Sequence, residues 1–298
     1  MTKIRIKNFG PIKEGYREND GWMDVKKVTV FIGYQGSGKS TVAKLISVFM
    51  WLEKSIVRGD LPEDLNSYKG LDDILRFHRI ENYLKDNTKV SYCGPSYNFI
   101  MVKKSNINSP LIKVEKQSLD KINQPKIMYV PAERNFLSAI SNINKVSDFI
   151  VGSLKNYAIE FRNAQLSFKD KDIALPINNT SVYYDAKEDE NYIVFDGKKL
   201  KLSEASSGFH SIVPLYWVSK YLIDYLKLGE KRLLDRLSPD QTVRRRNELN
   251  ELNKEFISEE VLKQKENTIN SKHICTHFVT TVEEPEQNLF PTSQKLML

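Results

Sequence analysis

The sequence predicts an α/β fold, and three consecutive segments near its beginning carry that prediction. Residues 25–32 form an almost continuous apolar run, which is typical of a strand covered on both faces. The glycine-rich stretch 33–41 follows at once, and residues 42–57 then place apolar side chains on several sides of a helix. This order of strand, loop and helix predicts that the loop opens directly onto the amino end of the helix.

Residues 33–41, Gly-Tyr-Gln-Gly-Ser-Gly-Lys-Ser-Thr, match the phosphate-binding P-loop pattern G-x-x-x-x-G-K-[ST] in full. Glycines let backbone amides point at phosphate oxygens, and the following helix presents its positive end to the same anion. We expect Lys39 to reach the β- and γ-phosphates and the Ser40 hydroxyl to bind Mg²⁺. The predicted nucleotide-binding residues are Gly33, Gln35, Gly36, Ser37, Gly38, Lys39, Ser40 and Thr41.

An acidic motif lies near the end of the sequence. The β-rich run 273–282 is followed by Glu-Glu-Pro-Glu at 283–286. A strand that delivers carboxylates at its carboxyl end is typical of a Walker B element, whose first carboxylate completes the Mg²⁺ shell and whose second orients or deprotonates the attacking water. We therefore expect Glu283 to be a metal ligand and Glu284 the catalytic residue. A solvated acidic turn is the alternative.

Ser206, Ser207 and Gly208 come just before a helical region. Alone, they predict no more than a helix N-cap beside a flexible residue. Beside the other two motifs, residues 205–209 resemble the L-S-G-G-Q signature of ABC and SMC/RecF-like ATPases. In that signature a serine hydroxyl, glycine amides and a helix amino end meet the γ-phosphate held by a second subunit.

The whole chain resembles SMC/RecF-type AAA ATPases of the group related to the OLD (overcoming lysogenization defect) proteins. Besides the P-loop, the segments that carry the resemblance are 6–13, 129–135, 204–208 and 283–286, in the expected order. The resemblance implies an α/β P-loop NTPase head of ABC/SMC type, with a mixed central sheet, an antiparallel β-subdomain and helical insertions. It also implies a homodimer that closes around ATP and Mg²⁺, in DNA repair or anti-phage defence, with a nuclease and DNA as possible partners.

In this group the chain normally continues through another strand that carries a switch histidine. The resemblance therefore predicts a head that is incomplete at its C-terminus, as a truncated, split or degenerate copy. Two glutamines, Gln117 and Gln124, are both candidates for the Q-loop position. We expect one ATPase domain over 1–298, with a variable lobe inserted at 60–125 and a charged helical insertion at 219–272.

Composition sets wider limits on the protein class. Of the 298 residues, 40% are hydrophobic and 28% charged, which excludes disorder over most of the length. Two cysteines cannot form a disulfide framework, so we expect a reducing cytoplasm. The first residues lack a signal-peptide core, and the most apolar stretch, 212–228, contains Lys220 and Asp224, so no membrane span is expected. The net charge of +7 is spread along the chain and fits either a polyanionic partner or a lysine-rich solvated surface.

The remaining segments predict ordinary elements. We expect strands at 3–9, around residue 90, at 99–102, at 126–130 and at 273–282. Residues 71–84 read as a polar, partly helical stretch, and residues 146–168 as an amphipathic helix. Residues 181–202 read as an antiparallel meander, because Asp196-Gly197 sits between two alternating runs. Residues 219–272 read as one or two solvated helices with mixed charge.

Three weaker candidates have plainer alternatives. Arg134 follows a strand end and suits a phosphate, a partner or, more simply, an ion pair near Glu133. The run His273-x-Cys275-x-His277 alternates on one face of the expected strand, but its spacing fits no common zinc pattern, so packing is the better interpretation. Arg244, Arg245 and Arg246 suit a nucleic-acid backbone or a solvated helix face equally well.

These signals predict a Mg²⁺-dependent ATPase that dimerises around its nucleotide. The rival from another class is an interaction module that binds ATP without hydrolysing it and needs a second polypeptide to complete it. A small-molecule kinase is a third interpretation, but it leaves Ser206–Gly208 and the long insertion unexplained.

Overall fold

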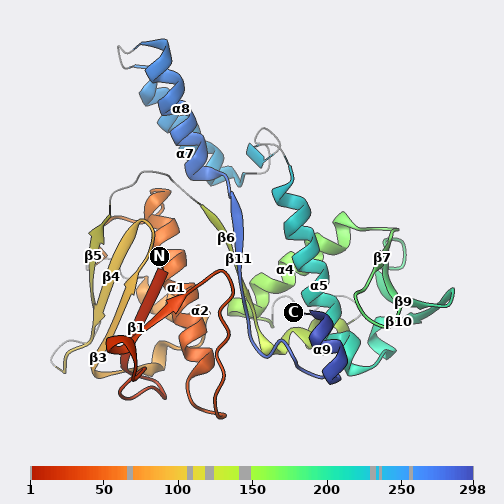
Figure 1. The fold of residues 1–298 in the computed structure, drawn as a ribbon. Helices are drawn as coiled ribbons and strands as arrows, with labels where there is room; N and C mark the ends of the chain where they lie inside the picture. Colours follow the sequence, from red (N-terminus) through yellow and green to blue (C-terminus); the bar gives the residue numbers. More distant parts are fainter. Residues whose placement is uncertain are drawn as a thin grey trace. The chain divides into compact units, whose positions relative to one another are not determined.

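The chain has a mixed α/β fold with both antiparallel and parallel sheets, as predicted (Figure 1). The computed structural model describes residues 2–65, 70–105, 110–117, 124–140, 149–228, 233–234, 237–254 and 258–297. The chain divides into two compact units: unit 1 is Met1–Ile127 with Leu228–Val279, and unit 2 is Met128–Lys227 with Thr280–Leu298. A single domain with insertions at 60–125 and 219–272 stays a prediction.

Unit 1 is built on a five-stranded antiparallel sheet. Its strands in spatial order are β2 (Trp22–Val25), β1 (Thr2–Phe9), β3 (Leu84–Cys93), β4 (Tyr97–Val102) and β5 (Leu111–Lys116). Alternate residues of β1, β3 and β4 are buried, so one face of the sheet is apolar. This face and helix α1 (Lys39–Val57) share one hydrophobic core, in which Phe49 stacks on Tyr92 with ring centroids 5.4 Å apart. The expected strands at 3–9, around residue 90 and at 99–102 and the helix at 42–57 are thus confirmed.

The strand expected at 25–32 is wrong beyond Val25. Val28, Val30 and Ile32 are 77%, 69% and 90% exposed, and no strand is assigned to this stretch. A local turn ends β2, because the Lys26 amide donates to the Thr29 hydroxyl oxygen at 2.8 Å instead of to a neighbouring strand. The apolar run is therefore an extended, solvent-facing approach to the P-loop.

The partly helical stretch expected at 71–84 is confirmed. Helix α2 (Leu71–Phe77) ends in a Schellman motif, in which Arg79 takes a left-handed φ of 56° and the Ile80 amide donates to the Leu75 carbonyl at 3.0 Å. Leu75 and Ile80 are both fully buried and supply the hydrophobic contact of this motif, which ends the helix. A short 3₁₀ turn, η2 (Glu81–Tyr83), then leads into β3.

Two further strands, β6 (Pro125–Val130) and β11 (His277–Val282), form a separate two-stranded sheet. The Thr276 amide donates to the Gln124 carbonyl at 2.9 Å and the Glu283 amide to the Val130 carbonyl at 3.0 Å. Residue numbers rise together between the two bonds, so the strands are parallel. The strand at 126–130 is confirmed, whereas the strand at 273–282 starts only at His277.

Unit 2 combines two packed helices with a small antiparallel sheet. Helices α4 (Gly152–Ser167) and α5 (Ser207–Leu226) meet at Phe161 and Trp217, whose ring centroids are 6.0 Å apart. The sheet has the order β10 (Lys198–Lys201), β9 (Glu190–Phe195), β8 (Ser181–Asp185) and β7 (Asp172–Ala174). The short elements are η3 (Ala132–Asn135), α3 (Phe136–Ala139), η5 (Leu202–Glu204) and α9 (Pro291–Met297).

Two predictions in unit 2 have different outcomes. The meander is confirmed: Asp196 and Gly197 form the two-residue β9–β10 turn with φ values of 48° and 73°, as a type I′ turn requires. The helix expected from 146 begins only at Gly152, and residues 141–148 lie outside the described part of the chain.

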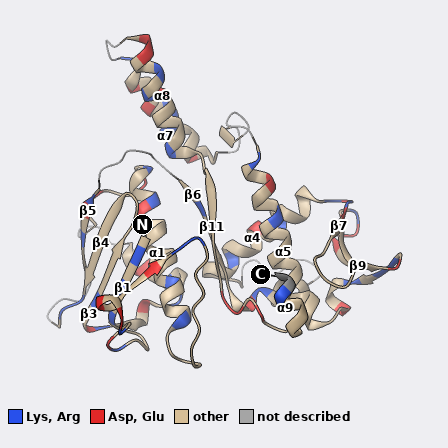
Figure 2. Cartoon of the chain, in the orientation of Figure 1, with Lys and Arg blue, Asp and Glu red and all other residues tan. Residues whose placement is uncertain are grey.

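Helices α7 (Pro239–Leu252) and α8 (Glu259–His273) form an antiparallel pair in unit 1, which confirms the prediction of solvated helices for this part of 219–272. The prediction is wrong for residues 219–226, which belong to α5 in unit 2, where Leu222 is buried. Basic and acidic residues are interspersed along both helices (Figure 2). Lys272 donates to Glu248 at 2.8 Å across the pair, and Ser238 begins α7 with a capping box. In the described part of the chain, every helix is too short or too polar to cross a membrane.

His78 gives unit 1 a testable response to acid. Burial lowers the pKa of this histidine to about 3, with Lys44 as the second cause. In the unfolded chain this histidine takes up a proton near pH 6.5, whereas in the folded chain it stays neutral until about pH 3. Its contribution to the free energy of unfolding is therefore fully present above pH 6.5 and is lost as the pH falls toward 3. We expect the free energy of unfolding to fall by up to ~1.4 kcal/mol per pH unit there through this group.

Urea unfolding of wild type and His78→Leu between pH 7 and 4 measures this slope. The variant should lose less stability over that range than the wild type. Parallel curves for the two proteins would contradict the assignment.

Candidate functional site

The P-loop residues lie in unit 1, where Gly33–Gly38 lead directly into α1. Gly36 and Gly38 have left-handed φ values of 75° and 98°, and the Ser37 amide donates to the Tyr34 carbonyl at 3.2 Å. Residues 33–37 are exposed. Glycine is needed at position 38 on two grounds. Its φ is left-handed, and a Cβ there would meet Ile12 Cγ1 at 2.7 Å.

Helix α1 presents its amino end to this loop. Gly38 is the N-cap and makes no side-chain cap, and the Val42 amide is the first to bond back, to the Gly38 carbonyl at 2.9 Å. The amides of Lys39, Ser40 and Thr41 form the first helical turn, which a helix leaves without intrahelical partners. The exposed Ser40 hydroxyl is carried on the same turn, while Thr41 is buried. This combination of free amides and helix dipole favours an anion.

Lys39 folds back over the loop. Its Nζ donates to the carbonyl oxygens of Gly33 and Tyr34, each at 2.8 Å. Both acceptors belong to exposed residues, and the described contacts of this ammonium include no acidic partner. A phosphate oxygen is a stronger acceptor for an ammonium than either carbonyl.

The acidic turn lies in unit 2. Glu283 follows β11, is half-buried and faces Tyr129, whose pKa is raised by burial and by the Glu283 carboxylate. Glu284 is exposed and takes a left-handed φ of 43°, which is strained for a residue with a Cβ. The two carboxylates therefore differ in surroundings, one held against a buried tyrosine and one open to solvent.

Arg134 holds this turn from inside. The side chain is 0% exposed, and its guanidinium donates to the carbonyls of Glu283 and Glu284 at 2.7 Å each. The expected ion pair near Glu133 is not what the structure shows, because the acceptors it records for Arg134 are all backbone carbonyls. Contact of Arg134 with a phosphate or a partner stays a prediction.

Ser206, Ser207 and Gly208 begin α5, also in unit 2. Ser206 holds the N-cap position but makes no side-chain cap bond, and its carbonyl accepts from the Phe209 amide at 2.9 Å. Ser206 and Ser207 are exposed. Gly208 lies against the acidic turn, since a Cβ there would be 3.2 Å from the Asn288 carbonyl oxygen. The predicted helix start is confirmed, and its first amides are not covered by a cap.

The structure thus gathers the predicted residues into two sets. Gly33, Gln35, Gly36, Ser37, Gly38, Lys39, Ser40 and Thr41 are in unit 1, and Ser206, Ser207, Gly208, Glu283 and Glu284 are in unit 2. Within unit 2 the acidic turn and the α5 start are tied together by Asn288, which donates to Ser211 Oγ at 3.0 Å. Hydroxyl and carboxylate oxygens, as on Ser40 and Glu283, are the ligands that Mg²⁺ prefers, so the donor chemistry fits that ion.

The weaker candidates have structural roles. His273 ends α8 and lies 3.4 Å from Glu248, so it does not share a strand face with His277 as expected. Among the described residues no group of three or more histidine, cysteine, aspartate or glutamate side chains is placed to hold a metal. Arg244 pairs with Asp60, and the Arg245 guanidinium donates to Asn270 at 2.8 Å, which favours the helix-face interpretation for these two.

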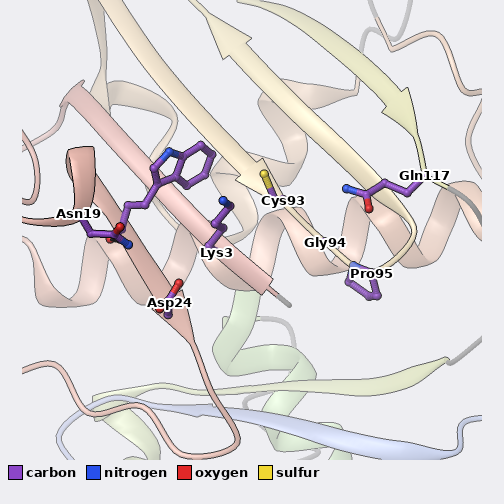
Figure 3. Close-up of a pocket in the computed structure, with 8 residues that line it drawn as sticks. Lys3, Asn19, Asp24, Cys93, Gly94, Pro95 and Gln117 are labelled. Atoms are coloured by element: carbon purple, nitrogen blue, oxygen red, sulfur yellow. Dashed lines mark hydrogen bonds between the residues drawn. The ribbon is translucent and has the colours of Figure 1, made fainter.

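Both Q-loop candidates belong to unit 1. Gln117 donates to Asn98 at 2.6 Å, and Gln124 is buried beside Thr276. Gln117 also lines a cavity of about 550 Å³ at one end of the five-stranded sheet (Figure 3). No sequence motif pointed to this cavity. The ammonium of Lys3, one of its lining residues, lies 4.8 Å from the centre of the Trp22 ring.

Comparisons with protein-family models, curated proteins and solved structures find no match for this chain. The resemblance to the SMC/RecF-like group accordingly stays a prediction, and the argument for function depends on the geometry of the two sets of residues.

Substitution at Gly38 tests whether the loop binds phosphate. Gly38→Ala introduces both a left-handed strain and a contact with Ile12, and should weaken Mg²⁺–ATP binding at least ~10-fold by shifting the first-turn amides. Gly59→Ala is the matched control, since Gly59 has a φ of 75° with open space around it and lies beyond the other end of α1.

Calorimetric titration with Mg²⁺–ATP compares the two variants with the wild type. Gly59→Ala should lose ~1 kcal/mol of stability and keep its affinity. Equal affinities for all three proteins would argue against the loop as the binding element.

Proposed function

We propose that this chain is a P-loop NTPase head of ABC/SMC type that binds Mg²⁺–ATP and hydrolyses it, with two copies closing around the nucleotides. The observation that carries the proposal is the loop itself. A full P-loop sequence has left-handed glycines at 36 and 38, opens onto the bare amino end of α1 and carries the Lys39 ammonium over its carbonyls.

Phosphate binding follows from this loop. The amides of Gly36–Gly38 and of the first α1 turn donate to phosphate oxygens, and Lys39 exchanges its carbonyl acceptors for the β- and γ-phosphates. Ser40 and Glu283 would each offer an oxygen ligand to Mg²⁺, which when bound would neutralise charge on the phosphates.

Hydrolysis requires a carboxylate at the attacking water. Glu284 orients and deprotonates that water, whose oxygen forms a bond to the γ-phosphorus while the bond to the β–γ bridging oxygen breaks, giving ADP and phosphate. Its exposure on the turn supports this role, because the carboxylate is open to a water and to substrate.

Dimerisation is proposed from the α5 start. Ser206, Ser207 and Gly208 present uncapped amides and exposed hydroxyls at the positive end of a 20-residue helix. Such a surface fits the γ-phosphate held by a second copy. A nuclease, DNA and a place in repair or anti-phage defence are proposed from the resemblance alone.

A nucleotide-dependent interaction module without turnover is the second candidate. Its support is that the P-loop residues belong to one compact unit and Glu284 to the other, so that nucleotide binding does not by itself require the carboxylate.

Three variants distinguish these functions. Lys39→Ala should abolish binding. Glu284→Gln should keep binding, lose at least ~100-fold in turnover and accumulate as an ATP-bound dimer, because only the chemical step is blocked. Glu260→Gln is the matched control, since Glu260 is an exposed glutamate of α8 in unit 1, outside the acidic turn, and it should behave as wild type.

Phosphate release and light scattering with Mg²⁺–ATP report turnover and dimer mass. Binding without turnover in the wild type would favour the interaction module. A wild type that neither binds nor hydrolyses ATP would contradict both candidates.

A further inference from the structure

Arg134 is a fully buried arginine that contacts the acidic turn. It belongs to η3 in unit 2 and donates to four backbone carbonyls. Its contacts are Nε to Ser211 at 3.2 Å, one terminal nitrogen to Pro131 at 3.3 Å and to Glu283 at 2.7 Å, and the other terminal nitrogen to Glu284 at 2.7 Å. Burying a guanidinium costs free energy, so packing alone does not explain an arginine at this position.

The surroundings compensate for this cost. Burial lowers the pKa of Arg134, while Tyr157 and the carboxylates of Glu284, Glu286 and Glu283 act in the opposite direction. The cation is therefore held by carbonyl dipoles and by the negative field of the very turn that it binds.

The two shortest bonds fix the backbone on both sides of Glu284. The Glu283 carbonyl belongs to the peptide before the Glu284 Cα, and the Glu284 carbonyl belongs to the peptide after it. Orienting both peptide planes sets φ and ψ of Glu284 together, and hence the direction of its Cα–Cβ bond. This accounts for the φ of 43°, which a glutamate does not adopt without outside support.

The same guanidinium reaches the first turns of α5. Ser211 lies four residues after the helix begins at Ser207, and its carbonyl accepts from Arg134. A parallel link runs from Asn288 to Ser211 Oγ at 3.0 Å. One buried side chain thus connects the acidic turn with the helix whose start carries Ser206–Gly208.

We propose that Arg134 is a positioning residue that aims the Glu284 carboxylate and transmits displacement of the α5 start to it. The proposal rests on the proposed ATPase function for its catalytic part. Lysine cannot replace arginine here, because an ammonium is a single donor centre and does not span two successive carbonyls as a planar guanidinium does.

Turnover kinetics of Arg134→Lys, Glu284→Gln and the double variant test the catalytic part. Arg134→Lys should lower kcat at least ~10-fold and change the KM for ATP less than ~3-fold, because a misaimed carboxylate impairs the chemical step and not the P-loop. In the Glu284→Gln background the same substitution should cause no further loss. An unchanged kcat in Arg134→Lys, or a loss that multiplies on top of Glu284→Gln, would overturn the proposal.

Hydrogen exchange tests the structural part without requiring turnover. In Arg134→Lys the hydrogen-bonded amides of the turn (Glu283, Gln287 and Leu289) and of residues 209–211 should exchange at least ~10-fold faster, with the rest of unit 2 unchanged. Arg162→Lys is the matched control, since Arg162 pairs with Asp189 elsewhere in unit 2 and should leave both segments unchanged.

Asn288→Ala provides a variant that spares the guanidinium if Arg134→Lys fails to fold. Exchange should then rise in both segments together, and a rise in one alone would refute the coupling. A wild type inert toward ATP with the expected exchange pattern would reject the ATPase proposal and keep the structural link.

Discussion

The candidate site depends above all on the left-handed backbone at Gly38, which turns an exposed loop into the amino end of a buried helix. That turn is useful only if α1 is held rigidly, and its two charged residues near the carboxyl end help to hold it. Glu53 accepts the amides of Ser96 at 2.5 Å and Tyr97 at 2.9 Å, and Lys54 donates to the Pro125 carbonyl at 2.6 Å. These bonds and the aromatic core support the proposal that the first-turn amides form a preorganised anion site.

In unit 2 a buried cation, Arg134, holds two exposed segments in place. The exposed helix start and the acidic turn are short segments with few contacts of their own, and such segments are ordinarily mobile. Arg134 and Asn288 join them through bonds to backbone and to Ser211. Helices α1 and α5 both begin without a side-chain cap, whereas the solvated pair α7 and α8 begin with serine caps at 238 and 258.

Local signals explain what the sequence could predict. The P-loop, the Asp196-Gly197 hairpin and the start of α5 are encoded by residues that are neighbours in the chain, so pattern alone finds them. The run 25–32 misleads because apolar periodicity cannot tell whether neighbouring strands exist to cover it. The sequence marks Arg134 as a candidate but could not predict its bonding partners, since Glu283 and Glu284 contribute backbone carbonyls from about 150 residues away.

The central claim is that the loop and the first turn of α1 bind the phosphates of a nucleotide, and amide hydrogen exchange tests it most directly. With saturating Mg²⁺–ATP, the account predicts strong protection of the amides from Gly36 to Thr41. Protection that falls elsewhere, with these amides exchanging as they do without nucleotide, would contradict it.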